Sequence, residues 1–261
     1  MLKPHISKRL KDKDTVRFGI AEVVFINNGE NKETQLLDEF FQLRMGILHE
    51  LQRNDDSVRN EKAVYSYAQR LSNLFIAMPP EEKEECIDLL KKSYMRYPGN
   101  EGIALAYAEA LGNLVAEKPD RADDYIHQLR DIYYQNRGNE KIELIYAEVL
   151  SKLVTEKPDM ADHCIRLLRR IYIQNRGNEK IALIYAEVLS KLVKEKPDMA
   201  DDYIHQLIDI YNQYIENEKI ALIYAEVLRK LVTEKPNKAD EYLNLLEHLR
   251  RKYQENEKIV R

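Results

Sequence analysis

The chain contains one segment that returns at a fixed spacing, and this constrains its fold more than any other feature. The segment that begins Asn139-Glu140-Lys141-Ile142 begins again at Asn178 and at Asn217, each copy 39 residues after the last. Related segments begin one period earlier at Asn100 and one period later at Asn256. Units of this kind bury their apolar faces only against their neighbours. We therefore expect a stacked array that presents a long surface rather than a catalytic pocket.

Two runs of apolar residues within 139–177 have the spacing of a helical face. The first follows Asn139, a favourable N-cap: Ile142, Ile145, Tyr146, Val149, Leu150, Leu153 and Val154. The second follows Pro158, with Asp159 as the expected N-cap: Ala161, Cys164, Ile165, Leu168, Ile171 and Tyr172. Gly177 is expected to end this helix in a left-handed conformation, as are Gly99 and Gly138 in earlier copies. Each unit is thus predicted to be a pair of antiparallel helices.

The repeat pattern divides the chain into an array and its two ends. Tandem helix pairs are expected over 60–255, as units 60–99, 100–138, 139–177, 178–216 and 217–255. Because residues 20–24 resemble residues 146–150, we interpret 15–59 as a divergent N-terminal capping repeat. Residues 1–14 are expected to be a basic exposed arm, and 256–261 either a terminal tail or the start of an unfinished repeat. The predicted class is all-α, with no strands.

Composition and charge exclude several classes of protein. The 261 residues carry a net charge of −4, so no overall basic field would attract nucleic acid. No apolar run of about 18 residues is present, so no membrane association is expected. The basic N-terminus is not followed by the apolar stretch of a signal peptide, and we expect a cytoplasmic protein. Cys86 and Cys164 share a repeat site with tyrosines and are interpreted as buried free thiols.

The unit resembles the tetratricopeptide repeat over 60–255, and more weakly over 15–59. Its first helix has a large residue followed by a small one: Tyr107-Ala108, Tyr146-Ala147, Tyr185-Ala186 and Tyr224-Ala225. Its second helix has a small residue near the start: Ala122, Ala161, Ala200 and Ala239. The family's unit has about 34 residues, and we place the additional ones in a longer inter-helix turn and an extended second helix. The resemblance implies a right-handed α-solenoid whose concave groove binds peptides or protein segments.

By this resemblance, the groove-facing side of the first helices should carry a row of glutamates flanked by basic residues. The candidate partner-binding residues are Lys141, Leu144, Glu148, Lys152, Lys180, Leu183, Glu187, Lys191, Lys219, Leu222, Glu226, Arg229 and Lys230. Family members that clamp a C-terminal carboxylate have asparagine where this chain has glutamate, which argues against that mode. The charged rows either recognise a partner or pair with each other and only solvate the surface. The corresponding N-terminal positions are largely uncharged: Gln69, Ser72, Asn73, Gly102, Gly112 and Asn113.

No residue pattern points to catalysis. Arg53 stands where a zinc-protease motif beginning at His49 would need its second histidine, and His127 and His205 are expected at the surface. Twelve of the seventeen tyrosines fall on three periodic sites, which we interpret as core rather than as a base-stacking platform. We expect no catalytic residues, metal or cofactor, and a protein or peptide partner. Two alternatives stay open: a nucleic-acid-binding helical-repeat protein, or the regulatory arm of a larger enzyme or complex.

Overall fold

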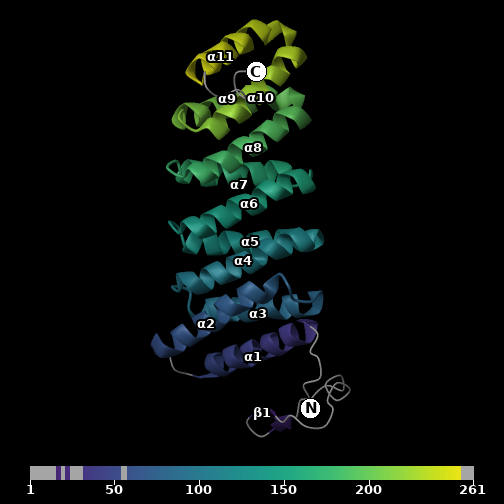
Figure 1. The fold of residues 1–261 in the computed structure, drawn as a ribbon, viewed down its shortest axis with the longest axis vertical. Coiled ribbons are helices and arrows are strands. Elements are labelled where there is room, and N and C mark those ends of the chain that lie inside the picture. Colours follow the sequence, from purple (N-terminus) through teal and green to yellow (C-terminus); the bar gives the residue numbers. More distant parts are fainter. Residues whose placement is uncertain (1–15, 19–20, 24–31, 54–57, 254–261) are drawn as a thin grey trace. The chain divides into compact units, whose positions relative to one another are not determined.

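A computed structural model describes residues 16–18, 21–23, 32–53 and 58–253 (Figure 1). The chain divides into two compact units, Met1–Tyr97 and Pro98–Arg261. Each unit contains helices that pack against their neighbours in chain order, which confirms the predicted all-α solenoid class. The expected basic arm (1–14) and terminal segment (256–261) lie outside the described residues.

The first unit contains three helices and a short hairpin. The helices are α1 (Lys32–Gln52), α2 (Val58–Phe75) and α3 (Pro80–Arg96), each of which packs against the other two. Strands β1 (Val16–Phe18) and β2 (Ala21–Val23) pair antiparallel. The prediction of no strands therefore does not hold for these six residues. In both strands apolar residues flank a charged one, a period of two that favours a strand over a helix.

The second unit has two kinds of helix that alternate along the chain. The first helices are α4 (Glu101–Glu117), α6 (Glu140–Glu156), α8 (Glu179–Glu195) and α10 (Glu218–Glu234). The second helices are α5 (Ala122–Gln135), α7 (Ala161–Gln174), α9 (Ala200–Gln213) and α11 (Ala239–Lys252). Short 3-10 turns precede three of them: η1 (Pro119–Arg121), η2 (Pro197–Met199) and η3 (Pro236–Lys238).

The packing of the second unit follows directly from this alternation. Successive first helices pack side by side and form one layer, here called the first-helix layer. Helices α5, α7 and α9 each pack against the first helix of their own repeat and that of the next repeat, and α11 packs against α10. Figure 1 shows these helix pairs following one another from teal to yellow. A first helix is therefore covered on several sides, as its two apolar strips predict.

The first helices begin where their asparagine caps were predicted. The side chain of Asn139 accepts a hydrogen bond from the Ile142 backbone N–H at 3.3 Å, and Asn100, Asn178 and Asn217 cap their helices in the same way. The Asn139 amide also donates to Glu101 of the preceding repeat at 3.0 Å. Each such side chain can thus satisfy a helix terminus and link two repeats at once.

The ends of the second helices differ from the prediction. Helix α7 begins at Ala161 with Met160 as its N-cap and no capping side chain, so Asp159 is not the cap. The reason is that Asp159 and Met160 lie in the turn that follows Pro158, ahead of the helix. Of the three glycines expected in a left-handed conformation only Gly138 adopts it, with φ of 89°.

The periodic tyrosines form the core, as predicted. Among the twelve, Tyr67 is half-buried and the others are buried. A tyrosine on a second helix contacts one on the next first helix: the ring centroids are 5.3 Å apart for Tyr133 and Tyr146, and 5.4 Å for Tyr172 and Tyr185. Rings at this separation and tilted to one another interact favourably beyond the area they bury. The same contact recurs between Tyr211 and Tyr224, so it joins all successive repeats of the second unit.

Ion pairs link the start of a second helix to the following repeat. Asp162 accepts a hydrogen bond from Lys196 at 2.6 Å, and one repeat later Asp201 accepts from Lys235 at 2.7 Å and from Lys238 at 3.1 Å. The hydrogen bonds from both lysines hold the pKa of Asp201 below its usual value. A carboxyl group with a lowered folded-state pKa stabilises the fold above its unfolded pKa of about 3.9, and this stabilisation is lost as the pH falls through the folded-state value.

We therefore expect Asp201→Asn to lower the free energy of unfolding at neutral pH, by no more than about 1 kcal/mol because the pair is partly exposed. The difference from the wild type should shrink as the pH falls below about 4. Urea unfolding at a series of pH values measures this. A difference that stays constant with pH would mean that the charge of Asp201 contributes nothing.

Candidate functional site

The outer side of the first-helix layer carries the residues predicted to bind a partner. Glutamates 148, 187 and 226 are exposed, as are Lys141, Lys180, Lys219, Lys152 and Lys191. Leu144, Leu183, Leu222, Arg229 and Lys230 are half-buried. Each repeat therefore offers an exposed carboxylate and lysines around a leucine that stays accessible. The structure brings the predicted residues of α6, α8 and α10 to the surface of one layer.

The glutamates of this row are not neutralised by the flanking lysines. Among the described residues, Glu148, Glu187 and Glu226 make no ion pair. Two of the lysines do pair, but with other acids: Lys180 Nζ lies 3.9 Å from Glu140, and Lys230 Nζ lies 3.2 Å from Glu234. If the glutamate and lysine rows paired with each other, ion pairs between them would be present. The described residues make none.

The uncharged N-terminal positions lie on two helices from different units. Gln69, Ser72 and Asn73 belong to α2, where Ser72 is buried and the other two are exposed. Gly102, Gly112 and Asn113 belong to α4 and are half-buried. Within the second unit, then, α4 lacks the lysines that α6, α8 and α10 display.

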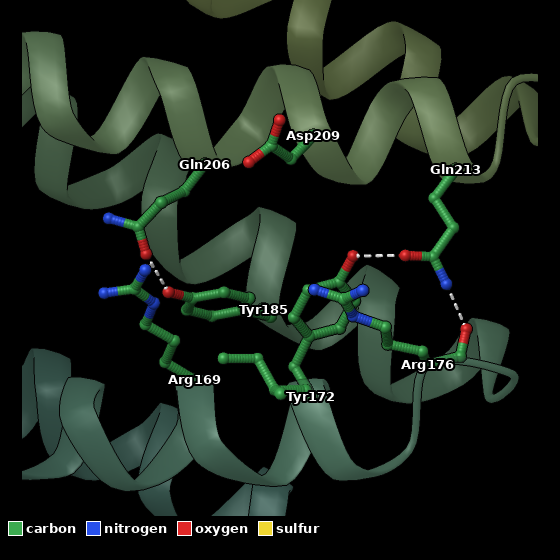
Figure 2. Close-up of a pocket in the computed structure, with 8 residues that line it drawn as sticks. Arg169, Tyr172, Arg176, Tyr185, Gln206, Asp209 and Gln213 are labelled. Carbon is green, nitrogen blue, oxygen red and sulfur yellow. Dashed lines mark hydrogen bonds between the residues drawn. The ribbon is translucent and has the colours of Figure 1, made fainter.

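A pocket that the sequence did not predict lies between α7 and α9. It has a volume of about 340 Å³ and is lined by Arg169, Tyr172, Ile173, Arg176, Tyr185, Gln206, Asp209 and Gln213. Figure 2 shows Tyr172 and Arg169 of α7 and Arg176 of the turn after α7 on one side, Gln206, Asp209 and Gln213 of α9 on the other, and Tyr185 of α8 behind them. The pocket exists because second helices pack against first helices and leave space between one another.

Tyrosine–glutamine hydrogen bonds fix the walls of this pocket. The Tyr172 hydroxyl donates to Gln213 at 2.9 Å, and the Gln213 amide donates to the Arg176 carbonyl oxygen. The Tyr185 hydroxyl donates to Gln206, whose amide donates to the Asp202 carbonyl at 3.2 Å. Burial raises the pKa of both tyrosines, and the nearby guanidinium groups partly oppose this shift, Arg176 at Tyr172 and Arg169 at Tyr185.

The tyrosine–glutamine bond within a repeat occurs in alternate repeats. Tyr107 donates to Gln128 at 2.5 Å, and Tyr185 to Gln206 two repeats later. In the repeats that follow each of these, leucines 167 and 245 occupy the glutamine position, and the buried hydroxyls of Tyr146 and Tyr224 find no partner among the described residues. The alternation of glutamine and leucine in the sequence is therefore a signal for which repeats make this hydrogen bond.

The remaining candidates occupy structural or surface positions. Cys86 and Cys164 are buried and free, as predicted, and burial raises the pKa of their thiols to about 12 and about 11. His127 and His205 are exposed, and each contacts the backbone carbonyl oxygen four residues earlier. Across the described ranges, no group of three or more His, Cys, Asp or Glu side chains is arranged to hold a metal.

No helix in the described part of the chain is long and apolar enough to span a bilayer. Comparison with models of known protein families, with curated proteins and with solved structures finds no match to this chain.

Proposed function

We propose that this protein is a non-enzymatic interaction scaffold that binds an extended segment of a partner protein along the outer side of the first-helix layer. The observation that supports this most strongly is the row of exposed glutamates, 148, 187 and 226, which make no ion pair among the described residues. Charged groups that recur at one place in each repeat and stay available for contact suit an extended ligand that meets successive repeats in the same way.

Two further features support a polypeptide as the ligand. Leu144, Leu183 and Leu222 are half-buried beside the charged rows, so each repeat combines apolar contact with charge. The lysines attract phosphate, but the glutamates between them repel it at similar range. This balance favours a protein over a nucleic acid as the ligand. We also propose that the array forms the right-handed superhelix with a concave groove that its resemblance to tetratricopeptide repeats implies. A location in the cytoplasm is part of the same proposal.

Reversing the three glutamates tests the proposal. We expect Glu148→Lys, Glu187→Lys and Glu226→Lys together to reduce recovery of the partner from native extract about tenfold or more. The reason is that each reversal puts a like charge against partner groups that the carboxylate attracted. Affinity capture followed by mass spectrometry measures recovery, and circular dichroism checks that the exposed substitutions leave the helices intact.

A matched control exists outside the row. Glu156 and Glu195 are exposed at the C-terminal ends of α6 and α8, and Asp198 is exposed in the turn after α8, so reversal of all three to lysine changes the net charge by the same amount. This control should retain the partner. Equal recovery by both triple variants and the wild type would show that the row only solvates the surface, and capture of RNA in place of protein would favour the nucleic-acid alternative.

A further inference from the structure

We propose that the pocket between α7 and α9 binds the side-chain carboxylate of an acidic protein segment through Arg169 and Arg176. This inference rests on the proposed function, because it assumes that the array binds protein segments. It assigns a second contact, however, which lies on the second helices rather than on the outer side of the first-helix layer.

The uncharged polar side chains of the pocket already have hydrogen-bond partners within the protein. Tyr172 donates to Gln213 and Tyr185 to Gln206, while both glutamine amides donate to backbone carbonyls. These bonds hold the walls in place before any ligand arrives, which lowers the entropy cost of binding. The groups left to recognise a ligand are three charged side chains, those of Arg169, Arg176 and Asp209.

These three charged side chains are exposed and make no ion pair among the described residues. Two guanidinium groups and one carboxylate give the pocket a net charge of +1, which one bound carboxylate would neutralise. A guanidinium presents paired N–H donors that match the two oxygens of a carboxylate. A phosphate dianion would bring a second negative charge towards Asp209, so the charge count favours a carboxylate.

The neighbouring spaces between second helices lack a pair of arginines that is available to a ligand. The counterparts one repeat earlier are Arg130 of α5 and Arg137 in the turn after it, and both are engaged: Arg130 lies 3.7 Å from Asp131, and Arg137 stacks over the Tyr134 ring at 5.1 Å. On the α9 side of the next space, isoleucines 208 and 215 occupy the arginine positions. Of the three spaces described in the second unit, the one between α7 and α9 has the arginine pair available.

The apolar rim of the pocket indicates what accompanies the carboxylate. Ile173 lines the pocket and is 46% exposed, one of the few large apolar side chains so exposed among the described residues. A ligand that places an apolar group beside its carboxylate would cover Ile173 while it pairs with the arginines. A segment with neighbouring glutamate and leucine residues provides both groups.

Fluorescence anisotropy with a defined peptide tests the proposal on the full chain. The probe is a capped, fluorescein-labelled peptide that alternates glutamate with leucine, and its glutamine counterpart is the uncharged control. We expect the wild type to bind the glutamate peptide and not the glutamine peptide. The Kd should rise about tenfold or more in the double variant Arg169→Gln, Arg176→Gln, because both charge-assisted contacts are lost.

Two further variants distinguish binding in the pocket from attraction by the overall electrostatic field of the protein. Arg166→Gln with Arg170→Gln removes the same charge from α7 outside the pocket, and should change Kd less than about threefold. Asp209→Asn removes the like charge and should lower Kd about two- to threefold.

The proposal is overturned if the wild type fails to bind the glutamate peptide, if the two arginine double variants behave alike, or if Asp209→Asn weakens binding. Inorganic phosphate that displaces the peptide more effectively than acetate would also overturn it. None of these results affects the test of the glutamate row, which uses another surface and the native partner.

Discussion

Leu189→Ala is expected to destabilise the second unit by about 2–5 kcal/mol, which would be the largest effect of any change considered for this protein. Leu189 is fully buried in α8, a helix that packs against α6, α7, α9 and α10. The substitution removes apolar contacts and leaves a cavity that closely packed helices can fill only in part. Urea unfolding followed by circular dichroism measures the loss.

The position of α8 in the array adds a second expectation. A repeat array is stabilised through nearest-neighbour interfaces. Destabilisation of an interior repeat should therefore also broaden the urea unfolding transition. Glu187→Ala on the same helix is the control and should change the free energy of unfolding by less than about 0.5 kcal/mol, since this side chain is exposed and unpaired among the described residues. A loss below about 1 kcal/mol for Leu189→Ala would mean that the neighbouring helices close the cavity.

Tyr185→Phe and Tyr146→Phe should have unequal effects although the two tyrosines hold the same site in adjacent repeats. The Tyr185 hydroxyl donates to Gln206, so its removal should cost about 1–1.5 kcal/mol. The Tyr146 hydroxyl is buried without a partner among the described residues, so its removal should be neutral or stabilising. Thermal and urea unfolding of the two variants compare them directly.

The residue that causes this difference can itself be changed. Leu167→Gln would place an acceptor in the repeat of Tyr146 where Gln206 stands in the repeat of Tyr185. In that background Tyr146→Phe should become destabilising. Equal costs for the two phenylalanine substitutions in the wild-type chain would contradict the alternation of hydrogen bonds.

The sequence was sufficient for most features that depend on residues close together in the chain, although Asp159, Gly99 and Gly177 do not cap their helices as predicted. Asn139 predicted the start of α6 because a cap acts on backbone groups two or three positions away. The apolar spacing in 139–177 predicted both helices and the buried tyrosines. Among the described residues of the second unit, these local signals identified the fold class and the exposed rows of charge.

Features that depend on contacts between repeats were mispredicted or missed. Asp162 pairs with Lys196, which belongs to the next repeat, and no pattern within one repeat predicts this contact. The pocket between α7 and α9 depends on the distance between two helices that touch mainly through side chains, and periodicity carries no information about that distance. One signal was available, because Arg130 and Arg137 recur 39 residues later as Arg169 and Arg176.

The alternating hydrogen bonds also define a structural unit larger than one repeat. Helices α5 and α9 differ at two positions, where Arg130 and Tyr134 correspond to Ile208 and Asn212, whereas α7, which lies between them, differs from α5 at six. Helices α5 and α9 are thus more alike than either is to α7, whereas α7 and α11, also two repeats apart, differ at ten positions. The alternation of glutamine and leucine nevertheless makes the doublet, four helices long, the unit by which this array would gain or lose length without changing which tyrosine hydroxyls have a partner.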